Sequence, residues 1–342
     1  MHVTRRELLK FAGAAGAVIA APGIVRAQKL EKTKVQIAVG GKALVYYLPL
    51  SIAEQLGYFK DEGLDVKIAD FAGGSKALEA VVGGSADVCS GAFEHTIILQ
   101  SKGQFFRTFA LQGRAPMIVL GASKKMGYKT PADLKGKKVG VTAPGSSTSM
   151  LVSFFLAKNG MKSSDVSFIG VGAGAGAISA VRNGQIDAIS NLDPVISTLA
   201  NDLDIVVDTR TLKDTLAVFG GNMPAGCLYA SQDFISANPN TTQALANAIV
   251  RANKWIQKVG VEEIAKRVPE SYLLGQPDVY KASLAKSMEG LSPDGLVPDD
   301  GPKTSLAAQA AYLPNFDAGK IDLSKIWTND FAKRANEKYP NG

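Results

Sequence analysis

Residues 72–91 read AGGSKALEAVVGGSADVCSG, and this stretch decides the fold. It predicts a glycine-rich loop, a helix that Ser75 caps and Gly83-Gly84 ends, and a short buried strand at 87–89. Residues 177–191, AISAVRNGQIDAISN, repeat this pattern 100 positions later. The recurring residues are Ala77, Ala80, Val81, Gly84, Asp87 and Ser90, which return as Ala177, Ala180, Val181, Gly184, Asp187 and Ser190.

The repeat predicts one chain with two similar α/β halves. Strand-like runs alternate with helical patterns through the first two thirds of the chain, which is typical of parallel α/β sheets. From Asn240 onward the pattern becomes helical, and the last two helices are predicted near 305–312 and 323–338. We expect the C-terminal helices to pack around the two halves. Glycine-opened helix starts that face each other across two such lobes would form a cleft.

The first 27 residues predict a targeting segment. Arg5-Arg6 is followed by an Ala/Gly-rich apolar run that is too short to serve as a membrane-spanning anchor. Val25-Arg26-Ala27 fits a small-x-small cleavage site. We therefore expect a twin-arginine signal that is cleaved near Ala27, and a mature protein in a bacterial periplasm.

The composition narrows the classes of function. The chain has 342 residues, 46% apolar and 20% charged, which is enough for two domains with full cores. Part of the net charge of +7 lies in the targeting segment, and no basic stripe carries interleaved aromatic residues, so we expect no nucleic-acid partner. Cys89 and Cys227 are expected to be buried free thiols, while a periplasmic disulfide between them stays open.

Three further stretches resemble one protein family. They are PLSIAEQLGYFKDEGLDV at 49–66, Gly73-Gly74-Ser75 with the following G-x-x-D-V, and DLKGKKVGV at 133–141. Together they resemble the substrate-binding proteins of bacterial ABC importers in the nitrate/sulfonate/taurine group, with the thiamine-pyrimidine-precursor binders as close relatives. The resemblance covers about residues 33–290.

The resemblance implies an α/β protein with a two-lobed periplasmic-binding-protein fold (type II, Venus-flytrap) and a helical C-terminal region. Lobe I would comprise residues 30–118 plus 224–342, and lobe II residues 119–223, with hinge crossings near 114–119 and 222–227. A small-molecule ligand would bind between the lobes, and the closed form would dock on an ABC permease of the inner membrane with its ATPase. We expect a monomer without cofactor or metal.

The candidate ligand-binding residues follow predicted strands or open predicted helices, where ligands bind in such folds. They are Lys42, Tyr46, Gly74, Ser75, Phe93 and Glu94 in lobe I, Arg114 at the hinge, and Ser146, Ser147, Thr148, Asn191 and Asp193 in lobe II. Free N–H groups and hydroxyls at a helix start suit an anion, so 145–148 is the leading anion site. The alternatives are that the serines only cap helices, that Tyr46 packs in the core, and that Lys42 is a solvated charge.

Glu94-His95 complicates the choice of ligand. A carboxylate facing the cleft would repel nitrate or a plain sulfonate and would suit a ligand with an amine or hydroxyl donor. The ligand is therefore either a small organic anion (sulfonate-, taurine- or nitrate-like) or a thiamine pyrimidine precursor or aromatic acid. The alternative is that Glu94 caps its helix and points away from the cleft.

A receptor is the expected function, and an enzyme on the same fold is the remote alternative. Pyrimidine-synthesising relatives need a cluster of His and Cys around iron, whereas this chain has two His and two Cys. No H-E-x-x-H, C-x-x-C, phosphate-loop or dinucleotide motif occurs in the sequence. A sensor lobe that signals to a membrane kinase stays open.

Overall fold

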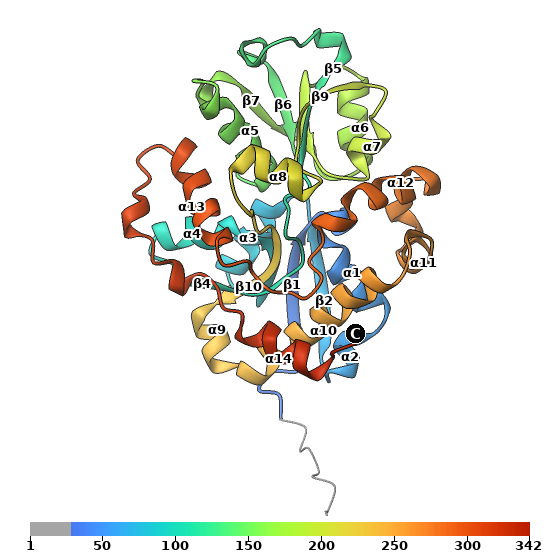
Figure 1. Cartoon of the computed structure of the whole chain (residues 1–342), viewed down its shortest axis with the longest axis vertical. Helices are drawn as coiled ribbons and strands as arrows, with labels where there is room; N and C mark the ends of the chain where they lie inside the picture. The colour runs from blue at the N-terminus through green and yellow to red at the C-terminus, as the bar shows by residue number, and fades with distance from the viewer. Residues whose placement is uncertain (1–28) are drawn as a thin grey trace, which may run out of the picture.

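The computed structural model describes residues 29–342, and the predicted twin-arginine signal lies outside the described residues. Two five-stranded mixed sheets form the centres of two lobes, one above the other (Figure 1). The first sheet has the order β2-β1-β3-β10-β4. Its strands are β1 (Lys34–Gly40), β2 (Asp65–Phe71), β3 (Val88–Ala92), β4 (Phe106–Leu111) and β10 (Gly226–Ser231).

The second sheet repeats this plan, with the order β7-β6-β8-β5-β9. Its strands are β5 (Val119–Ser123), β6 (Lys138–Val141), β7 (Ser167–Gly170), β8 (Ala188–Asn191) and β9 (Leu203–Asp208). In each sheet three neighbouring strands run parallel, and the fourth and fifth strands in the order join by antiparallel pairing. The two-lobed α/β prediction is therefore confirmed.

The 100-residue repeat corresponds to equivalent helix–strand units, α3 (Gly74–Val82) with β3 and α6 (Ala175–Arg182) with β8. Gly84 and Gly184 follow the two helices with φ values of 76° and 66°, which glycine adopts without strain. Asp87 accepts a hydrogen bond from the backbone N–H of Gln36 at 2.9 Å, and Asp187 accepts one from Lys138 at 2.8 Å. Each aspartate thus ties its strand to the neighbouring parallel strand, which explains why this residue recurs.

The remaining helices cover the sheets and complete the C-terminal region. Those before β10 are α1 (Leu48–Gln55), α2 (Tyr58–Asp61), α4 (Glu94–Ser101), α5 (Ser147–Lys158), α7 (Val195–Thr198) and α8 (Leu212–Phe219). Those after β10 are α9 (Gln232–Ala237), α10 (Pro239–Lys258), α11 (Val261–Arg267), α12 (Pro277–Ser287), α13 (Gly301–Tyr312) and α14 (Asp330–Lys338). No helix in residues 29–342 is long and apolar enough to cross a membrane.

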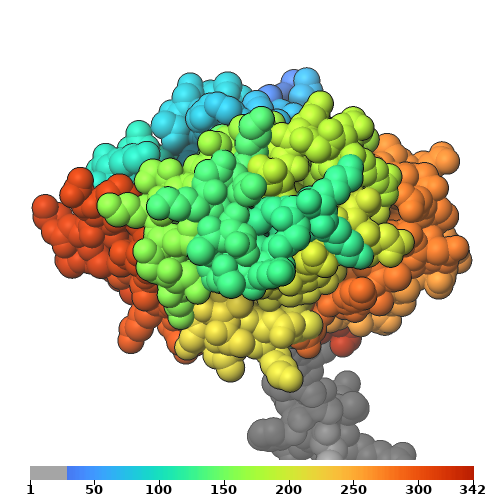
Figure 2. All heavy atoms as spheres, turned by 90° about the horizontal axis from the view of Figure 1, so that it is seen from above, coloured from blue at the N-terminus to red at the C-terminus, as the bar shows by residue number. Residues whose placement is uncertain are grey.

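The C-terminal helices pack on both lobes. Helix α10 lies on α1, α2 and β4, whereas α13 contacts α4 of one lobe and α5 of the other, and α12 contacts α7. From above, the C-terminal helices flank lobe II on two opposite sides (Figure 2). Residues of α10, α11 and α12 belong to one hydrophobic core with strands of both sheets, and Ala308 of α13 packs on Met150 and Phe154 of α5.

Three details differ from the sequence predictions. Helix α13 begins at Gly301 rather than 305, because Pro302 is tolerated in a first turn where its missing N–H has no helical partner. The helix expected over 323–338 is a short 3₁₀ turn (Leu323–Lys325) followed by α14. Ser75 does not cap α3: Gly73 is the N-cap residue, and the Ser75 hydroxyl bonds to the other lobe.

Two chain crossings join the lobes and pair with each other. At one end Gly113 accepts a bond from the N–H of Ala225 at 2.9 Å. At the other end the N–H of Met117 donates to the Thr209 carbonyl at 3.0 Å. The pairing between the two crossings therefore begins at Thr209 in the second crossing. Thr209 lies upstream of the hinge segment expected at 222–227.

Prediction: replacing Asp187 by alanine should lower the free energy of unfolding by about 1 kcal/mol, because the backbone N–H of Lys138 loses its side-chain acceptor. Urea denaturation of the mature protein measures this change. Asp187→Asn retains an acceptor oxygen and should recover most of the loss. Equal stability of Asp187→Ala and the wild type would contradict the role assigned to the repeated aspartate.

Candidate ligand-binding site

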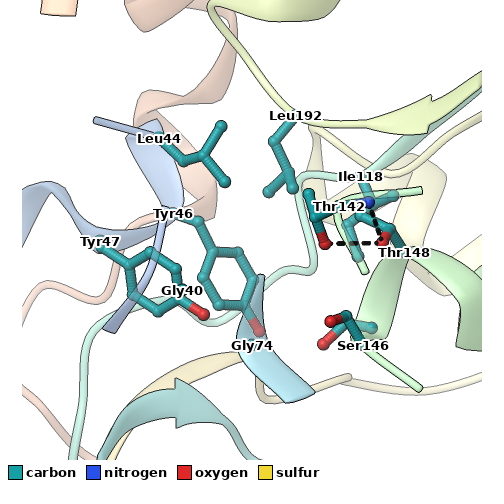
Figure 3. A pocket seen from close by; sticks show the side chains of 11 residues that line it. Gly40, Leu44, Tyr46, Tyr47, Gly74, Ile118, Thr142, Ser146, Thr148 and Leu192 are labelled. Atoms are coloured by element: carbon teal, nitrogen blue, oxygen red, sulfur yellow. Dashed lines mark hydrogen bonds between the residues drawn. The ribbon is translucent and has the colours of Figure 1, made fainter. Parts of the chain in front are cut away.

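A small cavity lies between the two lobes, where loops after strands of both sheets meet (Figure 3). Its volume of about 20 Å³ has room for about one water molecule. The lining residues are Gly40, Leu44, Tyr46, Tyr47 and Gly74 from lobe I, Ile118 from the first crossing, and Thr142, Ser146, Ser147, Thr148 and Leu192 from lobe II. In Figure 3, Leu44 and Leu192 lie at one end of the cavity and Gly74 and Ser146 at the other.

The start of α5 supplies the polar wall from lobe II. Strand β6 ends at Val141, and Pro144-Gly145 turns the chain so that α5 begins at Ser147 with Ser146 as its N-cap residue. The Thr148 hydroxyl accepts a bond from the N–H of Thr142 at 3.1 Å, which fixes this turn. Since the first N–H groups of a helix have no partners within it, the start of α5 presents donors and a partial positive charge to the cavity.

Two tyrosines supply the facing wall from lobe I. Tyr46 and Tyr47 are almost fully buried, with 3% and 4% of their surfaces exposed, and their rings meet edge to face. Desolvation by burial raises the pKa of both phenols well above the usual value, with a further contribution from the nearby Glu94 carboxylate. Both phenols are thus neutral at physiological pH, and no charged side chain is among the described lining residues.

Direct hydrogen bonds close the lobes on each other beside the cavity. Ser146 Oγ accepts a bond from the N–H of Ser75 at 3.0 Å, and Ser75 Oγ donates to the Pro144 carbonyl at 2.9 Å. On the other side, the N–H of Val45 donates to the Asp193 carbonyl at 3.1 Å. Lobe II therefore satisfies backbone and hydroxyl groups of lobe I in this closed form.

The backbones also touch where lobe I has Gly73. A Cβ atom at Gly73 would lie 2.8 Å from the Ala143 nitrogen and 2.9 Å from the Ala143 Cβ atom. Gly73 has an extended φ of −169° that any residue can adopt, so the contact with lobe II is what requires glycine here. Closure of the lobes to this distance depends on the absence of a side chain.

Glu94 lies directly behind the cavity wall. Its side chain is 2% exposed, and one carboxylate oxygen, Oε1, has no hydrogen-bond partner among the described residues. Desolvation raises the pKa of the Glu94 carboxyl, and a bond from the Ser147 hydroxyl opposes this shift. Because Ser147 lines the cavity, the carboxylate is one hydroxyl away from any bound solute.

His95 forms a second buried polar group behind Gly74. Its Nδ1 atom lies 3.1 Å from the Tyr229 hydroxyl, while Nε2 has no partner among residues 29–342. The ring approaches the cavity wall closely, since a Cβ atom at Gly74 would lie 3.4 Å from His95 Cε1. Desolvation lowers the pKa of His95 to about 4, so the ring is neutral at pH 7.

The structure brings seven of the twelve predicted residues to this place. Tyr46, Gly74, Ser146, Ser147 and Thr148 line the cavity. Ser75 joins the lobes beside it, and Glu94 lies behind Ser147.

The other five residues lie outside the cavity lining and have partners of their own. Lys42 forms an ion pair with Glu54 at 2.5 Å, and Arg114 donates from Nε to the Glu289 carbonyl at 2.8 Å. Asp193 is paired with Arg210 at 3.3 Å, Asn191 donates to the Gly172 carbonyl, and Phe93 is buried in the core. Cys89 and Cys227 are buried free thiols on the adjacent strands β3 and β10.

Sequence reasoning missed six lining residues: Gly40, Leu44, Tyr47, Ile118, Thr142 and Leu192. Three of them carried a usable signal. Gly40 and Thr142 stand at the carboxyl ends of predicted strands, and Leu192 lies between two predicted residues. Leu44 and Ile118 are apolar, so nothing in the sequence separates them from core residues.

Comparison with known proteins identifies the family. The NMT1/THI5-like family model matches residues 45–259, and the chain belongs to this family. YtlA of Bacillus subtilis is 24% identical over 273 residues, which cover 78% of this chain and 79% of YtlA. The 4-amino-5-hydroxymethyl-2-methylpyrimidine phosphate synthase of Aspergillus parasiticus is 24% identical over 297 residues, covering 83% of this chain and 86% of the synthase.

Solved structures confirm the fold. A protein from Bordetella bronchiseptica RB50 is 74% identical with a TM-score of 0.91, covering 92% of this chain and 100% of that one. The nitrate-binding protein NrtA from Synechocystis PCC 6803 has a TM-score of 0.70 at 18% identity, covering 90% of this chain and 89% of NrtA. The MOPS-bound alkanesulfonate-binding protein SsuA from Xanthomonas axonopodis pv. citri has a TM-score of 0.66 at 19% identity, covering 87% of this chain and 99% of SsuA. The chain thus has the fold of periplasmic binding proteins.

Prediction: Gly73→Ala should hold the lobes apart, because the added methyl group overlaps the Ala143 backbone of the other lobe. Small-angle X-ray scattering should give a larger radius of gyration than for the wild type. Gly174→Ala is the matched control, since Gly174 occupies the same place before α6 and its added Cβ meets nothing within 4 Å. A Gly73→Ala protein as compact as the wild type would contradict direct contact between the lobes at this position.

Prediction: Glu94→Gln should raise the melting temperature at pH 7. A carboxyl whose pKa is raised by folding binds its proton more tightly in the folded state than in the unfolded chain. The free energy of unfolding therefore falls as the pH rises above the pKa of this carboxyl in the unfolded chain. The neutral amide removes this cost, and the gain should vanish below about pH 4. Scanning calorimetry across pH measures the effect, with the exposed Glu79→Gln as control. A pH-independent difference would show that Glu94 is not an uncompensated buried carboxyl.

Proposed function

We propose that this protein is a periplasmic solute receptor that closes its two lobes around a small organic anion and delivers it to an ABC permease. The observation that carries the proposal is the polar cavity between the lobes, which the start of α5 and the hydroxyls of Tyr46, Ser146 and Ser147 surround. The family and the likeness to periplasmic binding proteins support the same reading. YtlA is named as a candidate binding protein, which is consistent with a receptor.

An anion suits the groups at the start of α5. Ser146, Ser147 and Thr148 offer hydroxyls, and the backbone N–H groups of the first turn add donors and the positive end of the helix dipole. Helix α3 starts at the same cavity with Gly74 and Ser75, so two helix starts converge on it. Donors of this kind fit a sulfonate, a taurine-like solute or nitrate without a paired lysine or arginine.

Glu94 favours a second ligand class, one with a donor group. Its Oε1 atom has no hydrogen-bond partner within residues 29–342 and would accept a bond from an amine or hydroxyl of a bound solute. The Ser147 hydroxyl, which is bonded to the same carboxylate, would accept a second bond. A thiamine pyrimidine precursor has such a group, whereas for an aromatic acid the neighbouring rings of Tyr46 and Tyr47 would offer a stacking surface. An enzyme on the same fold is the remote alternative, since a relative is named as a pyrimidine phosphate synthase.

Export and partners complete the proposal. The twin-arginine segment, cleaved near Ala27, would take the folded chain to the periplasm. There a monomer would meet the inner-membrane permease with its ATPase. The C-terminal helices that flank lobe II contact both lobes in the closed form, so their arrangement would change with closure and could report it to a membrane partner.

A thermal-shift screen of the mature protein tests the proposed function. Its panel holds nitrate, taurine, alkyl and aryl sulfonates, aromatic carboxylates and aminopyrimidines. A solute that binds the folded state raises the melting temperature by mass action. A shift with sulfonates or nitrate supports the anion site, a shift with aminopyrimidines alone transfers the proposal to the class that Glu94 favours, and silence across the panel contradicts both ligand classes.

Prediction: Ser146→Ala combined with Ser147→Ala should weaken binding of the best solute by roughly 1–3 kcal/mol, because two hydroxyl groups of the cavity wall are lost. Isothermal titration calorimetry measures the affinity. Ser163→Ala with Ser164→Ala removes another serine pair of lobe II, outside the cavity, and should leave the affinity unchanged. Equal affinities of the two double variants would exclude the start of α5 as the anion site.

A further inference from the structure

A third stretch of chain runs along the hinge. Two crossings join the lobes, and the segment 289–292, between α12 and α13, lies beside the first of them. Gly290 accepts bonds at its carbonyl from the N–H groups of Arg114 at 2.8 Å and Ala115 at 3.2 Å. Leu291 forms an antiparallel bridge with Gly113, and the N–H of Ser292 donates to the Gln112 carbonyl at 2.9 Å. This segment therefore pairs with the first crossing as a strand would.

The same segment reaches the second crossing through one side chain. The Oε1 atom of Glu289 accepts a bond from the N–H of Leu212 at 2.6 Å, at the first residue of α8. A carboxylate that accepts a helix N-terminal N–H makes a charge-assisted bond, stronger than a neutral one. The main-chain carbonyl of Glu289 accepts a bond from Arg114 Nε, so this one residue is bonded to both crossings.

Gly290 is wedged between the crossings. A Cβ atom at this position would lie 2.7 Å from Met117 Cγ in the first crossing and 3.2 Å from the Arg210 carbonyl oxygen in the second. Met117 is buried, and its backbone has a φ of 55°. Residues other than glycine seldom adopt this left-handed conformation. Such a conformation persists only where the surroundings hold it, and Gly290 packs against that side chain.

We propose that the segment 289–292 is a third strand of the hinge, and that Glu289 is a positioning residue that sets the balance between open and closed lobes. The inference rests on the proposed receptor function, because it concerns the motion of the lobes. The pairing of 290–292 with 112–115 holds the first crossing in either state. The Glu289–Leu212 bond fixes the second crossing in the closed arrangement described here, and its loss favours opening.

The affinity for a solute follows from this balance. A receptor that binds its ligand in the closed form loses apparent affinity in proportion to the fraction of closed molecules. Removal of one hydrogen bond that is made only in the closed form should shift the closed-to-open ratio about three- to tenfold. Glu289 lies outside the cavity lining, so a change in affinity on its substitution would arise through the lobes rather than through ligand contact.

The test compares Glu289→Ala with Glu289→Gln, which keeps an acceptor oxygen for Leu212. Spin labels on cysteines placed at the exposed Lys76 of α3 and Ser179 of α6 report the distance between the lobes, and hydrogen exchange reports the Leu212 amide. In Glu289→Ala we expect a larger open population, faster exchange at Leu212 and unchanged exchange at Arg114. Glu289→Gln and the exposed Glu270→Ala should resemble the wild type.

The outcomes separate the role of Glu289 from the receptor function. Wild-type distances and Leu212 exchange in Glu289→Ala would overturn the role of Glu289, even if solutes still close the wild-type lobes. Faster exchange of the Leu212 amide without a change in the distance between the spin labels would also overturn the role of Glu289. The Glu289–Leu212 bond would then stabilise only the start of α8 and not the closed arrangement of the lobes. A wild-type distance that no solute changes, including the one that raises the melting temperature most, would overturn the receptor function and with it this inference.

Discussion

The closed form of this protein depends on direct contact between the backbones of its two lobes. The contact requires glycine at position 73, because a side chain there would overlap Ala143. It brings Ser75 and Ser146 within hydrogen-bond distance, so that a serine of lobe II satisfies a helix-start N–H of lobe I. The small size of the cavity and the burial of Glu94 and His95 behind its wall follow from this approach.

The polar groups that close the lobes are also the ones that a solute would use. The N–H of Ser75 and the hydroxyl of Ser146 are bonded to each other beside a cavity that holds about one water molecule. A sulfonate or a larger solute that binds the closed form must therefore replace these bonds with its own. Ligand binding in this account is a competition between lobe–lobe and lobe–ligand hydrogen bonds, and a small difference between them sets the affinity.

The sequence was most informative where local pattern and repetition agreed. The two G-x-x-D units predicted equivalent helix–strand pairs, and the turn at 143–148 predicted the start of α5 at the cavity. The direction of charged side chains was not predictable, because their partners are set by tertiary structure. Lys42 turns to Glu54, and Asp193 turns to Arg210. Tyr47 and Leu44 were missed for another reason, since residues of these types fill the core as often as they line a cavity.

The most direct test of the account is a crystal structure of the wild-type protein with the solute that raises its melting temperature most. We predict that the solute lies between the lobes, in contact with Tyr46 and the first turn of α5, and that its polar group replaces the bond between Ser75 and Ser146. A solute bound away from this cavity, for example in the open groove beside Phe155 and Ile205 of lobe II, would contradict the central claim that closure of the lobes forms the binding site.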